Sequence, residues 1–339
     1  MKLIYHSNPQ KNFGDELNVD LWPRLAPDMF DETSRTGFLG IGTIVGRSFA
    51  NVDHLHVFSS GVGYDSVVDW KMPRTIWCVR GPLSAKVLGA DADAALTDGA
   101  ILAPNVLGID SRNVERKGVG LIPHWESELE GGWKEAATLA DMELITPIDD
   151  PVNVFQAINR KSLILTESLH GAIVADALGV PWLAIGTSGN VSIFKWTDWA
   201  MSLGVKLRIY QVPAPSGRAI SKFGRFRSAS ADPVIPDAEY AINHYRGPGE
   251  GGGGLSSLRS LSRSAKKTLL ENQLCAQLLG FSPVAMAERL AAVAKQEPQL
   301  SEAGTRARLA ERMLERFRAL QTEQLESGSS PRYRDNASR

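Results

Sequence analysis

The fold is decided by the stretch Leu163-Ile164-Leu165-Thr166-Glu167-Ser168-Leu169-His170-Gly171, which runs directly into residues 172–185. Its apolar start, rich in branched side chains, predicts a strand, and Ser168 is a residue type that caps helices. The helix predicted next ends at Gly179, and Pro181 opens a second apolar run. The order strand, helix, strand is typical of a parallel α/β sheet.

Ser168, Leu169 and His170 therefore fall where the first of these strands ends and the helix begins. Open α/β sheets bind ligands at that edge. The free backbone N–H groups of a helix N-terminus favour an anionic group such as phosphate. An imidazole beside a phosphate ester is a natural proton donor, although on pattern alone a capping or packing role for His170 is an equally good interpretation.

Length and composition indicate a globular protein of two domains with extensions, because 339 residues exceed one ordinary core. Cys78 and Cys275 are far apart, which predicts neither a disulfide framework nor a cysteine metal site, and favours a reducing compartment. The N-terminus turns polar too early for a signal peptide, so we expect a cytoplasmic protein. Residues 205–339 carry 21 Lys and Arg against 13 Asp and Glu, a basic end that favours anionic partners or is simply solvated.

The expected fold class is α/β, because short apolar segments alternate with Gly-rich or polar loops through the first two-thirds of the chain. Pro, Gly and Ser then become frequent, which is typical of a linker, and amphipathic patterns follow it. The predicted organisation is an N-terminal Rossmann-like domain (1–107), a connector (108–117), a C-terminal Rossmann-like domain (118–210), a linker (211–254), a helical extension (255–325) and a disordered tail (326–339).

Short motifs occur along residues 3–200 in a characteristic order. Each one alone is common, but the ordered series resembles the polysaccharide pyruvyl transferases, in particular bacterial exopolysaccharide members of the succinoglycan type. The motifs are Asn12-Phe13-Gly14-Asp15, Gly40-Ile41-Gly42-Thr43, Ser60-Gly61-Val62-Gly63, Val79-Arg80-Gly81-Pro82-Leu83-Ser84, Thr97-Asp98, Gly120-Leu121-Ile122-Pro123-His124 and Glu167-Ser168-Leu169-His170-Gly171.

The resemblance implies a GT-B-like arrangement of the two Rossmann-like domains, with phosphoenolpyruvate as the donor in the cleft. The pyruvyl group would move onto two hydroxyls of a sugar in an exopolysaccharide repeat unit, forming a cyclic ketal and releasing phosphate. The implied partners are phosphoenolpyruvate, a lipid-linked oligosaccharide or polysaccharide acceptor, and the inner face of the cytoplasmic membrane as a peripheral contact. Neither a cofactor, a metal nor a nucleic acid is expected.

The same resemblance suggests roles for individual residues. His170 would be the general acid, and Arg80 would clamp the anionic donor with its planar guanidinium. Asp15 is interpreted as a base for an acceptor hydroxyl or as a helix cap. Many relatives carry an Arg before the Leu-His pair, whereas this chain has Ser168. The further candidates are Ser168, Leu169, His124 and Ser84 for donor binding, and Asn12, Gly14, Gly42, Gly61 and Gly63 for acceptor binding or loop shape.

Two histidines and a basic segment receive non-catalytic interpretations. His54 and His56 share one strand face but lack a third ligand nearby, so a structural role is favoured over a metal site. The segment containing Lys222, Arg225 and Arg227 is interpreted as a solvated loop, with binding of a lipid-linked diphosphate as the alternative. The basic helix near residues 258–270 either packs on the catalytic domains or meets anionic lipid headgroups.

Two other functions fit the same pattern. A GT-B glycosyltransferase would bind a nucleotide sugar across the same cleft, since fold does not determine function. A nucleotide site would favour a longer second domain than this chain offers. A non-catalytic sugar-binding subunit of a polysaccharide assembly complex is the other alternative, and the presence of both Arg80 and His170 argues against it.

Overall fold

The first half of the molecule is built on a parallel sheet of four strands in the order β1-β2-β3-β4. In the computed structural model, residues 1–7, 9–226, 233–246 and 263–329 are described. The strands are β1 (Lys2–Ile4), β2 (Thr36–Leu39), β3 (His54–Phe58) and β4 (Arg74–Cys78). The helices are α1 (Phe13–Leu25), η1 (Pro27–Met29), α2 (Pro82–Leu88), η2 (Ala92–Ala94), η3 (Gly99–Leu102) and α3 (Ala103–Val106).

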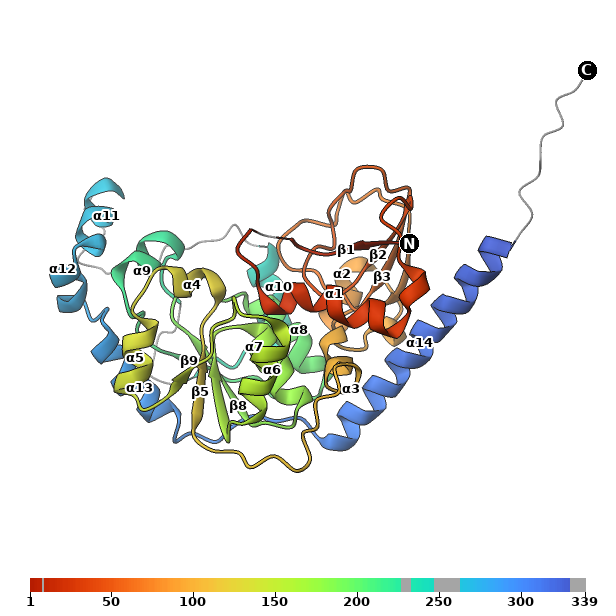
Figure 1. Ribbon diagram of the computed structural model, residues 1–339. Coiled ribbons are helices and arrows are strands. Elements are labelled where there is room, and N and C mark those ends of the chain that lie inside the picture. Colours follow the sequence, from red (N-terminus) through yellow and green to blue (C-terminus); the bar gives the residue numbers. More distant parts are fainter. Residues whose placement is uncertain (8, 227–232, 247–262, 330–339) are drawn as a thin grey trace, which may run out of the picture.

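The second half carries a parallel sheet of five strands in the order β6-β5-β7-β8-β9, beside the first (Figure 1). The strands are β5 (Val119–Ile122), β6 (Glu143–Leu144), β7 (Leu163–Thr166), β8 (Trp182–Gly186) and β9 (Ile209–Gln211). The helices are α4 (Trp125–Leu129), α5 (Trp133–Leu139), α6 (Pro151–Asn159), α7 (Leu169–Ala177) and α8 (Ile193–Ser202). The two sheets confirm the predicted parallel α/β class.

The strand, helix, strand prediction from the opening stretch is confirmed by β7, α7 and β8. Ser168 caps α7, because its hydroxyl accepts a hydrogen bond from the Gly171 N–H at 3.4 Å. β7 and β8 pair in parallel, with Ile164 opposite Trp182. His170 therefore lies on the first turn of α7, at the carboxyl edge of the second sheet.

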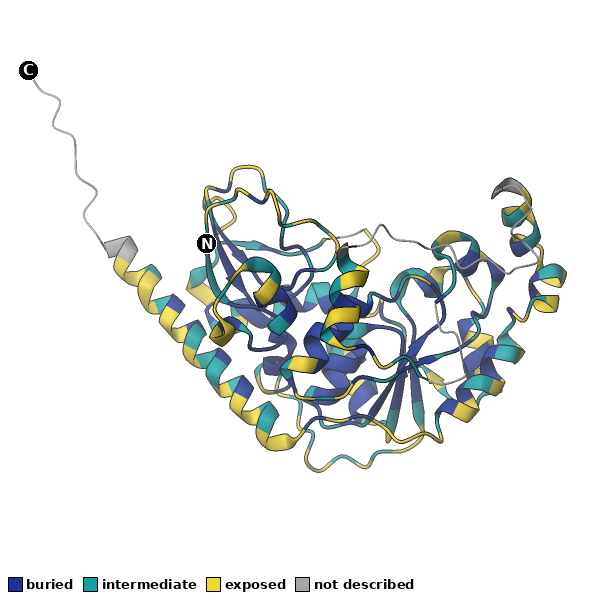
Figure 2. Ribbon diagram, turned by 180° about the vertical axis from the view of Figure 1, so that it is seen from behind, coloured by how far each residue is buried: buried dark blue, intermediate teal, exposed yellow. Residues whose placement is uncertain are grey.

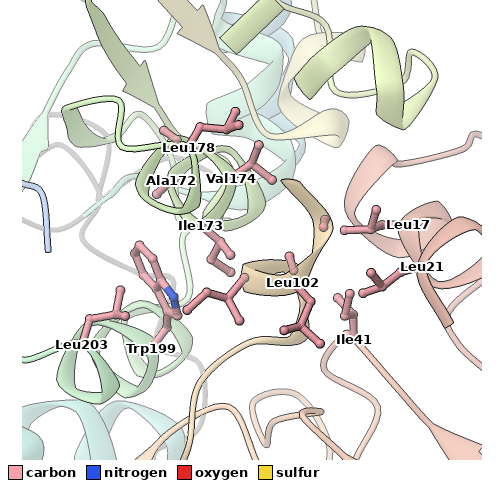
Figure 3. Close-up of a cluster of buried hydrophobic side chains, with 14 of the residues drawn as sticks. Leu17, Leu21, Ile41, Leu102, Ala172, Ile173, Val174, Leu178, Trp199 and Leu203 are labelled. Atoms are coloured by element: carbon pink, nitrogen blue, oxygen red, sulfur yellow. The ribbon is translucent and has the colours of Figure 1, made fainter. Parts of the chain in front are cut away.

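One hydrophobic core runs continuously from the first half into the second (Figure 3). Phe13, Leu17 and Leu21 are spaced four residues apart on α1, so they share one buried face. The same cluster contains Ile173 of α7 and Trp199 of α8. The halves are thus fused by apolar packing between their helices, which fixes the loops that face one another.

The predicted linker over residues 211–254 is wrong for its described part, which contains α9 (Gly217–Phe223) and α10 (Ala238–Arg246). Ala241 of α10 is fully buried in the core of the first half, and the Tyr245 hydroxyl donates to the Asp65 carbonyl at 2.8 Å. The segment was predicted as a linker because it is rich in Pro, Gly and Ser, but it also contains apolar residues. Among them, Ala219, Ile220 and Ala241 are buried.

The described residues of the predicted helical extension form four helices: α11 (Arg263–Glu271), α12 (Gln273–Leu278), α13 (Pro283–Val293) and α14 (Ala303–Ser329). α13 packs on the second half, and α14 returns along the first half (Figure 1). Buried and exposed residues alternate along α14 (Figure 2). The predicted start of the disordered tail at 326 is wrong, since α14 continues to Ser329.

The start of the basic helix predicted near residues 258–270 lies outside the described residues. In its described part, α11 packs against α9, and Leu270 is buried there. Of the helices described, none combines the length and apolarity needed to cross a bilayer.

Candidate functional site

A cavity of about 340 Å³ lies between the halves, where loops at the carboxyl ends of both sheets meet. The first half contributes the segments that follow β1, β2, β3 and β4, and the second half those that follow β5, β7 and β8. Eight predicted site residues line it: Asn12, Asp15, Gly42, Arg80, His124, Ser168, Leu169 and His170. Four others, Gly14, Gly61, Gly63 and Ser84, are absent from the lining.

The imidazole of His170 packs on the start of α1. The Phe13 ring meets it edge to face at 6.2 Å between centroids, and a Cβ at Gly14 would fall 1.9 Å from His170 Nδ1. Burial, together with the positive charges of Lys195 and Arg80, lowers the pKa of His170 to about 3. In the unliganded cavity the ring is therefore neutral near pH 7.

His124 caps α4 and is held by two donors on one nitrogen. The Glu126 N–H reaches its Nδ1 at 3.4 Å, and the Asn190 amide reaches the same atom at 2.8 Å. Because a backbone N–H can only donate, the neutral ring carries its proton on Nε2. Burial is the main cause that lowers the pKa of His124 to about 3. The side chain thus supplies the cavity with an N–H donor rather than with a charge.

Glu167, at the end of β7, connects the segments that follow β5 and β8 by hydrogen bonds. Its buried carboxylate accepts from the Thr187 N–H at 3.0 Å, from the Thr187 hydroxyl, and from the His124 N–H at 3.4 Å. Burial raises the pKa of the Glu167 carboxyl. Glu167 positions the loops after β5 and β8 relative to the turn that carries His170.

Asp15 of α1 brings a carboxyl group to the cavity. Asn12 donates to this group at 3.1 Å, and burial raises its pKa to about 6, although electrostatic interactions with His6 and Lys195 act in the opposite direction. Asn12 itself caps α1. Asp15 therefore does not cap the helix with a hydrogen bond of its own, and it titrates close to neutrality, as a proton-transfer group requires.

Lys195, in the first turn of α8, supplies the cavity with a cation that the sequence reasoning missed. Its Nζ lies 4.1 Å from the centre of the Tyr64 ring and donates to the Tyr64 hydroxyl. Throughout the described part of the chain, no carboxylate forms an ion pair with Lys195. The only available signal was its place shortly after β8, because the loop joining the strand to α8 has no motif.

Comparison with curated proteins finds one relevant similarity. The chain is 36% identical over 233 residues to the succinoglycan biosynthesis protein ExoV of Rhizobium meliloti (strain 1021), an alignment that covers 67% of this chain and 72% of the relative. The chain belongs to the ExoV family. No family model matches the sequence, and no solved structure matches the fold. The GT-B-like arrangement of the halves therefore stays a prediction.

In this ExoV-family chain, Arg80 is held more firmly than its sequence context suggested. Its Nε donates to Asp198 at 3.1 Å, and its terminal nitrogens donate to the Thr43 hydroxyl at 2.9 Å and the Val62 carbonyl at 2.6 Å. The Arg80 side chain is only 1% exposed. Arg80 faces the cavity, but most of its donors already have protein partners.

Ser84 lies outside the cavity, in the contact between the halves. Its hydroxyl donates to Asp198 at 2.5 Å and accepts from the Val62 N–H at 3.0 Å. The other Asp198 oxygen accepts from the N–H groups of Leu83 and Ser84, both at 2.9 Å. The Arg80-to-Ser84 motif thus anchors the start of α2 on α8, and Ser84 lies in that contact rather than in the cavity lining.

The two histidines of β3, His54 and His56, both have hydrogen-bond partners within the protein. His54 is bonded to the Thr75 hydroxyl at 3.0 Å, and His56 accepts from the Trp77 indole N–H at 2.9 Å. Burial lowers the pKa of His56 to about 4. Among the described residues, no group of three or more His, Cys, Asp or Glu side chains is arranged to hold a metal ion.

Proposed function

We propose that this ExoV-family protein transfers the pyruvyl group of phosphoenolpyruvate onto two hydroxyls of one sugar in an exopolysaccharide repeat unit. The observation that carries the proposal is the convergence of Asp15, His124, His170 and Lys195 on one cavity at the carboxyl edges of both sheets. The match to a succinoglycan biosynthesis protein supports the pathway. The ordered motifs support the donor.

The proposed reaction balances without an oxidant or reductant. The donor's methylene carbon gains a proton, and its enol carbon becomes an oxocarbenium-like centre that two sugar hydroxyls attack in turn. The carbon–oxygen bond to phosphate breaks, and two carbon–oxygen bonds to the sugar form. Of the two hydroxyl protons, one replaces the proton given to the methylene and the other leaves with phosphate.

The charge and protonation state of each residue determine its role in the proposed reaction. Lys195 and the His124 Nε2–H bind the anionic donor, and the remaining N–H of the Arg80 guanidinium adds to them. Asp15, whose pKa is raised to about 6, accepts the proton of an acceptor hydroxyl. His170 donates the proton to the methylene carbon.

The low pKa of His170 makes its protonation depend on the donor. Two of the causes that lower the pKa are the charges of Lys195 and Arg80. A bound carboxylate and phosphate would offset these charges and raise the pKa. The acid form would then accumulate in the donor complex, where it is needed.

The test is phosphate release from phosphoenolpyruvate by the full chain, with and without lipid-linked oligosaccharides as acceptors. We expect acceptor-dependent phosphate release and a ketal-bearing product detected by mass spectrometry. Because the proposed chemistry uses protonation, pretreatment with a chelator should leave the rate unchanged. Transfer of a sugar from a nucleotide sugar, with phosphoenolpyruvate untouched, would replace the proposal by a glycosyltransferase. Absence of both reactions with any acceptor would favour a non-catalytic sugar-binding subunit.

A further inference from the structure

A second cavity, of about 460 Å³, lies at the carboxyl ends of β8 and β9. It shares no lining residue with the first cavity. Thr187 and Gln211 mark the strand ends, Arg225 and Arg289 contribute cations, and Phe281 closes one side. None of these side chains has a part in the proposed proton transfers.

The three basic residues of the segment predicted as solvated, Lys222, Arg225 and Arg227, differ in their surroundings. Lys222 pairs with Glu130 at 2.9 Å, and Arg227 lies outside the described residues. The Arg225 guanidinium lies 4.8 Å from the centre of the Phe281 ring and lines the cavity. Along the described ranges of the chain, no carboxylate pairs with Arg225.

The setting of Arg225 favours an anionic ligand. Burial lowers the pKa of its guanidinium, which means that the charge is incompletely solvated. A guanidinium stacked on an aromatic face still offers its N–H groups at the edge, in the fork that suits phosphate oxygens. Arg289, fixed by donation from its Nε to the Gln211 carbonyl at 3.0 Å, adds a second cation to the wall.

The remaining lining of the second cavity is apolar and suits an uncharged group attached to that anion. Val212, Ala214 and Ile220 are buried apolar residues that line the cavity. Such a combination of apolar surface with a few converging polar groups is typical of small-molecule sites. A bare inorganic ion would leave most of this volume empty.

One short segment separates the two cavities. Thr187 lines the second cavity, and Asn190, three residues later, donates to His124 in the first. Three residues of extended chain span at most about 11 Å. Arg225 is held against this segment by a backbone bridge to Ser188. A ligand in the second cavity is therefore adjacent to the proposed site of pyruvyl transfer.

We propose that the second cavity binds the diphosphate of a glycosyl diphosphate acceptor, so that the attached sugar reaches the first cavity. The inference rests on the proposed function for the identity of the acceptor. Nucleotide sugars and lipid-linked saccharides both carry this group. Arg225 and Arg289 hold the diphosphate, and the apolar wall contacts what is attached beyond it.

Direct binding to the full chain tests the proposal independently of catalysis. The probes are inorganic pyrophosphate, uridine diphosphate and farnesyl diphosphate, titrated calorimetrically with and without saturating phosphoenolpyruvate. We expect at least one diphosphate to bind, and phosphoenolpyruvate not to displace it. Preference for uridine diphosphate would identify a nucleotide sugar, and preference for farnesyl diphosphate a lipid-linked acceptor.

Arg225→Gln should weaken binding of the preferred diphosphate tenfold or more. Arg218→Gln is the matched control, because it removes the same charge from an exposed residue of α9 outside the cavity and should bind as wild type. Wild-type affinity in Arg225→Gln, displacement by phosphoenolpyruvate, or failure of all three probes to bind wild type would overturn the proposal. Diphosphate binding without phosphate release from phosphoenolpyruvate would instead contradict the proposed function alone.

Discussion

Three glycines of the first half stand directly against side chains of the candidate site. A Cβ at Gly61 would lie 2.3 Å from the Arg80 guanidinium carbon, and one at Gly63 would lie 2.8 Å from Lys195 Cγ. The third, Gly14, meets the His170 ring. These residues were predicted only as loop-shaping or acceptor-binding glycines. Their lack of a side chain is what lets the functional groups of both halves approach.

Gly14→Ala should therefore disable the site without unfolding the protein. The added methyl group would fall 1.9 Å from His170 Nδ1, so the imidazole must move away from its position. We expect a loss of turnover of a hundredfold or more, since displacements of about 1 Å have effects of that size. Gly304→Ala is the control, because nothing lies within 4 Å of a Cβ there. Equal turnover of both variants would contradict the role of the contact.

The ionisation of His170 should respond to the donor. Its pKa of about 3 in the free protein keeps the ring neutral, and bound anionic groups favour the protonated form. We expect saturating phosphoenolpyruvate to raise the pKa, and the protonated fraction at pH 7 with it, as measured by NMR titration. His56, with a pKa near 4 and no place in the cavity, is the internal control. A His170 ring that stays neutral at pH 7 in the complex cannot be the general acid.

At the scale of elements, α2 and α8 are joined through one buried carboxylate. Asp198 of α8 accepts two N–H groups at the start of α2, the Ser84 hydroxyl and the Arg80 guanidinium. Both charged side chains are at most 1% exposed. A buried pair of this kind contributes specificity of position more than net stability. Here it sets how the first half meets the second.

Asp198→Asn should destabilise the protein strongly, because it leaves the Arg80 charge buried without a counter-charge. Breaking a buried pair costs about 3–5 kcal/mol of unfolding free energy. Asp53→Asn, at the exposed pair with Arg35, is the matched control and should unfold at close to the wild-type urea midpoint. Urea unfolding measures both. Equal decreases in unfolding free energy for the two variants would show that Asp198 contributes no more to stability than an exposed carboxylate.

At the scale of the whole molecule, the C-terminal helices fasten the two halves. α13 contributes Met286, Leu290 and Val293 to the core of the second half. α14 then places Phe317 in the core of the first half, 5.6 Å between ring centroids from Trp22 and 5.5 Å from Phe58. The extension is therefore part of the fold rather than an appendage to it.

Phe317→Ala should show that the stability of the first half depends on α14. Removing a buried phenyl ring costs about 3–5 kcal/mol of unfolding free energy. Leu325→Ala, on the same helix but 76% exposed, should stay within about 0.5 kcal/mol of wild type. Urea unfolding followed by tryptophan fluorescence separates the two outcomes. An unchanged midpoint for Phe317→Ala would mean that the first half is stable without α14.

The sequence by itself determined the local elements and the edge of the sheet at which function lies. Alternation of apolar runs with capping residues predicted β7, α7 and β8, because hydrophobic periodicity and caps act over a few residues. The same reasoning placed Ser168, Leu169 and His170 at a strand end. His124 and Arg80 were found in the same way.

Only the tertiary structure decided which of these groups share a cavity and what state they are in. Lys195 carries no local motif, and it entered the site because α8 packs beside the first half. Asp198, more than a hundred residues away in the chain, accepts from the Ser84 hydroxyl and from Arg80 Nε, so it draws both into the interface. The low pKa of His170 and the raised pKa of Asp15 arise mainly from burial. Burial is created by distant segments, so no local pattern predicts it.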